Sequence, residues 1–330
     1  MVLGTSVWLA VASFPDNKVK IVYCNAGQGD ETLIQSGFIQ ILIDGSRPGR
    51  ALSCLQKHVP FFDRQIELMV VSHPQTDHFG GLADVIKKYR VMSFVYNGIK
   101  GDSREWEEFS KLVLAEGAEI EAVAAGDEVR VGGMKLRVLW PEKSRLSVLG
   151  RQLSDTGSSV NQFSDSQTDK PTTGKPETEN RKLKTDNRVL GVSSPDDLNS
   201  GAVVMDFNYG EFDALFTGDI GEEEEQEMLK GLASKGLTFL TQGETLGSID
   251  VLKVAHHGSK YSSSLDFLKA VRPALAVIEV GKNSYGHPTA ETLARLKEAG
   301  ARILRTDQDG EVVVTTNGKS FNVSSSRNRN

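Results

Sequence analysis

Residues 66–90 carry the pattern that decides the fold, and they run IELMVVSHPQTDHFGGLADVIKKYR. The first part is a nearly continuous apolar run, which is typical of a buried strand. A polar loop containing His73 and His78 follows directly, and Gly80 and Gly81 then begin a segment with helical spacing. The sequence therefore predicts a strand, a polar loop at its end, and a helix.

Strands followed by helices recur on both sides of this stretch. Gly27 and Gly29 mark a tight turn in NAGQGD, because glycine adopts the positive φ that such turns need. Strands are expected at 18–24, 31–35, 39–44, 66–73, 92–97, 119–141, 202–219, 248–257, 274–281, 301–307 and 311–316, and helices at 51–59, 80–90, 103–117, 221–232, 263–271 and 288–300. Hairpins or turns between strands are expected at 126–127, 132–133, 209–210 and 308–310. Two sheets face to face with helices outside would satisfy this order.

The overall composition is that of a globular protein with an acidic balance. Of the 330 residues, 38% are apolar and 25% are charged, and 38 Lys and Arg against 44 Asp and Glu give a net charge of −6. This balance argues against a protein that binds nucleic acid through its overall charge, since such proteins are usually basic. It does not exclude an enzyme that meets nucleic acid at a local cleft through metal ions.

An apolar N-terminal segment, 1–16, precedes a predicted single domain over 17–330. The segment is too short to span a bilayer, so no membrane span is expected. Two alternatives stay open for it, an ordered or frayed terminus and the remnant of a trimmed anchor, and localisation stays open between cytoplasmic and exported. Composition shifts after Pro141, and the polar stretch at about 150–190 is predicted to be a disordered insertion, because it cannot bury enough apolar surface to fold alone.

Cys24 and Cys54 are the two cysteines of the chain. Two cysteines cannot build a disulfide framework or a cysteine-rich zinc site. Between one bridge and two free buried thiols, the sequence favours the free thiols.

Histidine and aspartate side chains follow three predicted strands, at the point where each strand ends. They are His73, Asp77, His78, Asp219, His256 and His257. Imidazole and carboxylate ligands suit zinc, manganese or iron. Since the three strand ends can converge at one edge of the sheets, the sequence predicts a metal site there. His58 stands alone in a predicted helix and is expected to be structural.

Ordered motifs along the chain resemble those of the metallo-β-lactamase superfamily, and within it those of the hydrolase domain of ComEC-type competence proteins. The motifs are GQGD (27–30), LIDG (42–45), SHPQTDHFGGL (72–82), LWP (139–141), FTGD (216–219), LKVAHHGS (252–259), YGHP (285–288) and RTDQDGEVVV (305–314). They cover nearly everything except the insertion and the ends. The resemblance implies an αββα sandwich of two mixed β-sheets flanked by helices, with a metal site at one edge.

The resemblance also implies a role for the matching positions in a site for one or two divalent ions, zinc or manganese. His73 would bind the first ion, Asp77 and His78 would bind the second, and Asp219 would bridge both. Asp77 would in addition orient the attacking nucleophile, and His287 would lie beside the site as a substrate contact or proton donor.

One of His256 and His257 would be the last histidine ligand, and the sequence favours His256 because it lies nearer the strand end. Asp30 and Asp44 fall in turns beneath the site, where they would orient histidines, and a role in capping those turns stays open.

Ser259 and Lys260 are candidates for substrate contact, although for Lys260 the sequence favours a solvated surface lysine.

The chain departs from the family pattern at the first metal position. The family motif is His-x-His-x-Asp-His, ComEC-type relatives often have Asp at its third position, and this chain has Gln75 there, a weak neutral ligand at best. Asn25 stands where GQGD is usually preceded by Asp, and NSGA (199–202) ends in Ala202 where relatives often have Ser. We therefore expect one tightly bound ion and one weakly bound ion.

These observations predict a metal-dependent hydrolase, since a bound metal lowers the pKa of its water to about 7 and supplies hydroxide at neutral pH. The resemblance favours the phosphodiester bonds of DNA or RNA as the substrate. A hydrolase of small-molecule lactams, or a promiscuous lactam and ester hydrolase, is the first alternative, and a degenerate, metal-poor binding module is the second. The sequence leaves the oligomeric state open.

Overall fold

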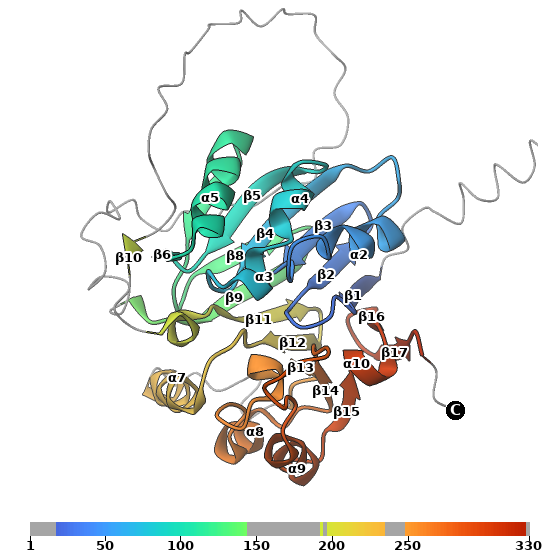
Figure 1. The fold of residues 1–330 in the computed structure, drawn as a ribbon. Helices are drawn as coiled ribbons and strands as arrows, with labels where there is room; N and C mark the ends of the chain where they lie inside the picture. Colours follow the sequence, from blue (N-terminus) through green and yellow to red (C-terminus); the bar gives the residue numbers. More distant parts are fainter. Residues whose placement is uncertain (1–17, 144–191, 194–196, 235–247, 328–330) are drawn as a thin grey trace, which may run out of the picture.

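The computed structural model of the chain describes residues 18–143, 192–193, 197–234 and 248–327, and two β-sheets packed face to face form its centre (Figure 1). The first sheet has the order β17 (Phe321–Ser325), β16 (Val312–Thr316), β1 (Val19–Tyr23), β2 (Thr32–Ser36), β3 (Ile39–Ile43), β4 (Gln65–Val71), β5 (Arg90–Tyr96), β7 (Glu119–Ala122). The second has the order β15 (Arg302–Arg305), β14 (Leu275–Ile278), β13 (Val251–Lys253), β12 (Phe212–Phe216), β11 (Val204–Tyr209), β9 (Met134–Trp140), β8 (Glu128–Val131). A short parallel pair joins β6 (Ile99–Lys100) and β10 (Val192–Ser193).

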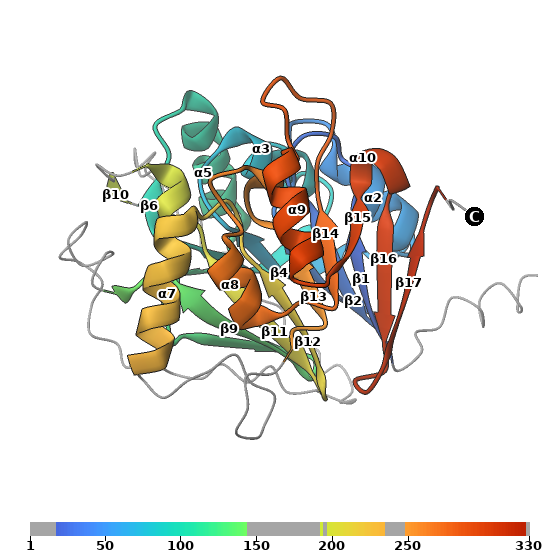
Figure 2. The same ribbon diagram turned by 90° about the horizontal axis from the view of Figure 1, so that it is seen from below.

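Helices cover the outer faces of both sheets, so the layers follow the order helix, sheet, sheet, helix (Figures 1 and 2). The first sheet carries α2 (Ala51–His58), α3 (Thr76–Phe79), α4 (Leu82–Ile86) and α5 (Arg104–Glu116). The second carries α7 (Glu222–Ser234), α8 (Leu265–Val271) and α9 (Ala290–Glu298), and connections contain η1 (Leu198–Gly201), η2 (Ala255–Gly258) and α10 (Thr306–Asp309). The predicted αββα sandwich of two mixed sheets is confirmed.

Side chains that alternate along each strand fill three buried layers. On β4, Leu68 and Val70 lie between the sheets, whereas Met69 and Val71 pack beneath the helices of the first sheet. On β12, Leu215 belongs to the layer beneath the helices of the second sheet. Central strands are therefore buried on both faces, which explains their nearly continuous apolar runs.

The strand directions bring several loops to one edge of each sheet. β3 is parallel to β4, and β12, β13 and β14 are parallel to one another. β2 is antiparallel to β3, so β2 begins at the edge where β3 ends. Segments that follow β3, β4, β12, β13 and β14, and the segment before β2, therefore lie at these edges.

The predicted hairpin at 126–127 is wrong, whereas the hairpins at 132–133 and 209–210 are confirmed. The turn at 126–127 joins β7 to β8, but these strands pair with β5 and β9 in different sheets. At 308–310 the chain turns between two strands as predicted; these strands lie in different sheets, and the turn contains the end of α10 and Gly310. Turn residues mark a change of chain direction, but they do not say which sheet the next strand joins.

The predicted N-terminal segment 1–16 and the insertion at about 150–190 lie outside the described residues. Among the helices of the described ranges, none has the length and apolar character that crossing a bilayer requires.

The prediction of two free thiols is also wrong, because Cys24 and Cys54 form a disulfide. Cys24 directly follows β1, Cys54 lies on the buried face of α2, and their Cα atoms are 6.0 Å apart, a distance that a disulfide spans. The bond links the segment that leads into the GQGD turn to the helix that covers the first sheet. Sequence alone could not show this proximity, since it depends on where α2 packs.

We expect reduction of this disulfide to lower the free energy of unfolding by about 2–4 kcal/mol, because the bond constrains the unfolded chain. The measurement is urea denaturation with and without a thiol reductant. A Cys54→Ala variant is the control, and its unfolding midpoint should not respond to the reductant. A wild-type midpoint that does not respond either would contradict the prediction.

Candidate metal centre

The strand ends bring histidine and carboxylate side chains from both sheets to one point. His73 and His78 follow β4, and their ring centroids are 4.1 Å apart. Asp219 follows β12, and its Oδ2 lies 3.3 Å from Nε2 of His78. His257 follows β13, and its Nε2 lies 3.6 Å from the same oxygen. We call this group, together with Asp77, the buried cluster.

Hydrogen bonds at Nδ1 fix the orientation of two imidazoles. Nδ1 of His78 lies 2.8 Å from Oδ2 of Asp44, and Nδ1 of His73 lies 3.0 Å from Oγ of Ser72. The Ser72 hydroxyl donates to Asp44 at 2.7 Å, and the Ser72 backbone N–H donates to the same carboxylate at 2.8 Å. Asp44 therefore holds the loop after β4 and both of its histidines in place.

His257 is held in the same way by a backbone carbonyl. Its Nδ1 lies 2.8 Å from the carbonyl oxygen of Glu279, which directly follows β14. A carbonyl only accepts, so Nδ1 carries a proton and Nε2 is the nitrogen that faces the cluster. In metal sites, a hydrogen bond from the ring nitrogen that does not bind the metal is what orients a histidine ligand.

The atoms that face the centre of the cluster are buried, and they have no hydrogen-bond partner among the described residues. They are Nε2 of His73, His78 and His257 and Oδ1 of Asp219. Ligand atoms of His73, His78 and Asp219 lie within 4.8 Å of one another, and so do those of Asp77, His78 and His257. Leaving such atoms without a partner is costly, whereas imidazole nitrogen and carboxylate oxygen are ligands of zinc and manganese. The donor set fits one or two divalent ions.

The charges in the cluster favour a cation. Burial lowers the pKa of His78, but the carboxylates of Asp219, Asp44 and Asp30 outweigh burial and hold this pKa well above its usual value. Burial raises the pKa of Asp219, but His78 and His257 bring it well below the usual value. Protons on His78 and His257, where burial is outweighed by the carboxylates and both pKa values are raised, thus compensate the negative charge, and a bound metal would take the place of those protons.

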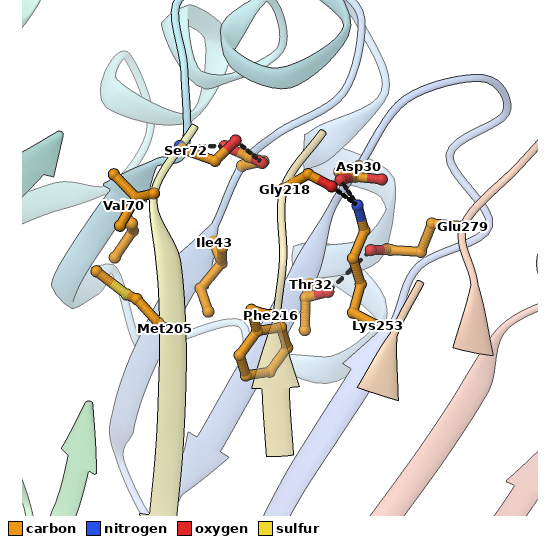
Figure 3. Close-up of a pocket in the computed structure, with 12 residues that line it drawn as sticks. Asp30, Thr32, Ile43, Val70, Ser72, Met205, Phe216, Gly218, Lys253 and Glu279 are labelled. Atoms are coloured by element: carbon orange, nitrogen blue, oxygen red, sulfur yellow. Dashed lines mark hydrogen bonds and ion pairs between the residues drawn. The ribbon is translucent and has the colours of Figure 1, made fainter. Parts of the chain in front are cut away.

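Lys253 lies buried at the end of β13, directly beneath the cluster. Its Nζ contacts the Asp30 carboxylate, donates to the Gly218 carbonyl at 3.0 Å, and lies 3.8 Å from Oδ1 of Asp219 (Figure 3). Burial would lower the pKa of Lys253, but Asp30, Asp219 and Glu279 raise it. The lysine is therefore a fixed positive charge between the two sheets.

Asp30 is the carboxylate that this ammonium balances most directly. Burial would raise its pKa, but Lys253, followed by His257 and His78, lowers it to about 2. Oδ1 of Asp30 also lies 3.3 Å from Nδ1 of His257. Asp30 thus connects the GQGD turn, the ammonium and the cluster.

A cavity with room for about one water molecule lies among these charges and the apolar layer between the sheets (Figure 3). Its polar side contains Asp30, Lys253 and Glu279, and its apolar side contains Met205 and Phe216.

The structure places His257, and not His256, inside the buried cluster. The His256 side chain is 31% exposed, and its Nε2 lies 4.0 Å from Oδ2 of Asp219. Both histidines adopt positive φ in η2, at 50° and 53°, so the chain turns sharply after the strand and directs the second ring inward. Nearness to the strand end in sequence therefore does not decide which ring points to the cluster.

Gln75 lies at the rim, where its Nε2 donates to Oδ1 of Asn199 at 2.5 Å. This bond joins the loop after β4 to the segment before β11. Two of the three residues by which the chain departs from the family pattern, Gln75 and Ala202, lie beside this contact, since the Ala202 N–H donates to the Asn199 carbonyl.

The remaining predicted site residues differ in exposure. Ser259 is buried, and its Oγ accepts from the Tyr261 N–H, so it does not face a substrate in this structure. Lys260 is exposed, with Nζ 4.9 Å from the centre of the Tyr261 ring. His287 is half-buried beside His256, with ring centroids 5.6 Å apart.

Sequence reasoning missed Ser72, Lys253 and Glu279 as parts of the site. The signal that could have found the last two is a charged residue inside an otherwise apolar strand, in DVLKVA (250–255) and ALAVIEV (274–280). Such a charge is rarely buried without a partner.

Replacing Lys253 by methionine should lower the free energy of unfolding by about 3–5 kcal/mol, because the buried carboxylates lose their compensating charge. Urea denaturation of the metal-free protein measures this change. Lys260→Met is the matched control on the surface, where about 0.5 kcal/mol or less is expected. Equal effects in the two variants would refute the role of Lys253.

The comparisons with known proteins agree with this fold. Residues 40–281 match the family model of the metallo-beta-lactamase superfamily. ComE operon protein 3 of Bacillus subtilis (strain 168) is 25% identical over 251 residues, which cover 76% of this chain and 24% of that protein. Competence protein ComA of Neisseria gonorrhoeae is 34% identical over 301 residues, which cover 90% of this chain and 32% of that protein. The chain thus spans about a quarter to a third of the length of these relatives.

Among solved structures, the metallo-beta-lactamase fold protein YhfI from Bacillus subtilis has a TM-score of 0.50 and 11% identity, covering 90% of this chain and 100% of that one. This likeness concerns the fold alone. The expected resemblance to competence proteins is confirmed by the named relatives. Since the family model matches most of the chain, the protein belongs to the metallo-beta-lactamase superfamily of metal-dependent hydrolases.

Proposed function

We propose that the chain is a metal-dependent phosphodiesterase that acts on DNA or RNA. One observation carries the metal-dependent part. His73, His78 and His257 each have Nδ1 hydrogen-bonded within the protein and Nε2 buried without a partner beside a carboxylate. This arrangement prepares three lone pairs for a divalent ion, which we propose to be zinc or manganese.

In this proposal the cluster holds up to two ions in overlapping positions. His73, His78 and Asp219 surround one position, and Asp77, His78 and His257 surround the other. Because Gln75 bonds to Asn199 instead of contributing a charged donor, the first position is the weaker one. When bound, such ions act as Lewis acids on a water molecule and on the phosphoryl oxygen.

The residues at the rim would then handle the substrate. The Asp77 side chain is 23% exposed, so it can reach both the cluster and a nucleophile at the mouth. His287 stands further out, where burial and the neighbouring His256 lower its pKa, so it stays neutral near pH 7. We propose that Asp77 orients the nucleophile and that His287 contacts the leaving group.

Two observations support nucleic acid as the substrate class. Competence protein ComA is named for competence, and a further relative, 24% identical over 295 residues, is named Recombination protein 2 of Haemophilus influenzae; both names refer to processes of DNA. In addition, the cluster opens beside a groove of about 560 Å³ that Asp77 and Gln75 line together with an exposed arginine, Arg47. An open groove with a basic residue suits a strand that extends beyond the reacting bond.

We expect Asp219→Ala to lose bound metal and at least about 100-fold in turnover of a single-stranded oligonucleotide, because Asp219 faces three imidazoles. Elemental analysis after dialysis gives the ions per chain, and strand cleavage gives turnover. His257→Ala and His256→Ala form a matched pair, and only the first should lower the metal content.

Outcomes of this experiment separate the alternatives. Metal retained in Asp219→Ala and in His257→Ala would contradict the assigned ligands. A wild-type protein that binds metal but hydrolyses only a chromogenic lactam would replace the nuclease proposal. A wild-type protein that binds neither zinc nor manganese would leave a binding module without catalysis.

A further inference from the structure

Two exposed side chains on opposite loops line the groove beside the cluster. Arg47 lies on the loop between β3 and α2, and Tyr285 lies on the loop between β14 and α9, which projects at the top of Figure 2. We propose that this groove binds an unpaired nucleotide of a single strand, with the Tyr285 ring stacked on its base and Arg47 contacting its phosphate. The inference rests on the proposed function, since it names the form of nucleic acid that the site takes.

Tyr285 is unusually exposed for a large aromatic side chain, at 67%. Its ring lies 5.7 Å from the His287 ring with an interplanar angle of 31°, and the His287 ring lies 5.6 Å from that of His256. The three rings lead from the groove to the edge of the buried cluster. A strand whose base stacks on Tyr285 could therefore extend along these rings toward the metal positions.

The loop that carries Tyr285 is held in one conformation by a buttressing side chain. Asn283 Oδ1 accepts from the backbone N–H groups of Tyr285 and His287, at 3.1 and 3.0 Å. Its Nδ2 donates to the carbonyl groups of Gly281 and His287, both at 2.9 Å. A ring presented on a fixed loop loses little conformational freedom on binding, which favours affinity. The structure thus keeps much of the Tyr285 ring exposed to solvent.

Arg47 supplies positive charge in a protein whose net charge is −6. Its guanidinium makes no hydrogen bond or ion pair with the residues that the structure describes, so it is free to bind an anion. The backbone beside it is fixed, because the Ser46 N–H donates to the Asp30 carbonyl at 2.7 Å and the Ser46 carbonyl accepts from Gly81 at 2.9 Å. Asp77 and Asp102 also line the groove, so a phosphate would lie on the Arg47 side.

Single strands fit these features better than duplexes do. Stacking on an aromatic side chain needs a base whose face is exposed, and a duplex hides its base faces within the stack. A volume of about 560 Å³ lies in the range of small-ligand sites, so it suits a splayed nucleotide and not a double helix.

The test compares cleavage of a single-stranded dT oligonucleotide with cleavage of bis(p-nitrophenyl) phosphate, a phosphodiester without a base. We expect Tyr285→Ala to lower kcat/KM on the strand by about 10-fold, mainly through KM, and to leave the small substrate unchanged. Tyr285→Phe keeps the stacking face and should behave like wild type. Tyr261→Ala is the matched control, since Tyr261 is 69% exposed but does not line the groove.

A strand with abasic positions separates the two proposed contacts. The effect of Tyr285→Ala should disappear on this strand, because there is no base to stack. The effect of Arg47→Ala, which we expect to be about 3- to 10-fold, should persist, because the phosphate remains. Arg90→Ala, at the opposite end of the first sheet, is the control for loss of a surface charge.

Binding of a fluorescein-labelled phosphorothioate dT strand, followed by anisotropy with manganese present, makes the inference testable without turnover. Weaker binding by Tyr285→Ala than by Tyr261→Ala supports it. Unchanged binding and cleavage by Tyr285→Ala overturn it, even where the wild type is an active nuclease. If the wild type hydrolyses neither substrate, the proposed function is wrong. The binding comparison would then still show whether the groove binds a single strand through Tyr285.

Discussion

The contact between Lys253 and Asp30 is the interaction on which the rest of the site depends. The lysine comes from the second sheet and the aspartate from the turn between β1 and β2 of the first, so the pair joins the two halves of the sandwich directly under the cluster. Its ammonium also lies near Asp219, so one fixed cation restrains both a structural and a candidate ligand carboxylate. Each of these buried charges would be strongly destabilising without its partners, so the position of each one depends on the others.

The ligand atoms that face the centre of the cluster carry most of the free-energy cost of burying this group. Nε2 atoms of three histidines and an aspartate oxygen are withdrawn from water without partners of their own. Asp44, Ser72 and the Glu279 carbonyl hold the rings in this unfavourable state in advance. A cation that enters the cluster therefore finds its ligands already oriented, and its binding free energy adds to the stability of the folded chain.

Much of the fold was predictable because its signals are local. Apolar runs, glycine turns and helical spacing predicted most strands and helices, and the hairpins at 132–133 and 209–210 form as predicted. The convergence of His73, His78 and Asp219 was predictable because each follows a buried strand. The choice between His256 and His257 depends on the positive φ of η2, and the disulfide depends on where α2 packs; neither is encoded in local spacing. β17 was not predicted, because its alternating residues are only partly buried.

The pairing of β1 with β16 joins opposite ends of the chain, since Val19 lies opposite Thr316. During synthesis β1 and β2 emerge long before β16, so one side of β1 stays unpaired until β16 has also been made. Such an open edge can pair with other chains. Folding of the first sheet is thus a late, non-local event, and a chain shortened by a few tens of residues at its C-terminus would keep every candidate metal ligand yet be prone to aggregation.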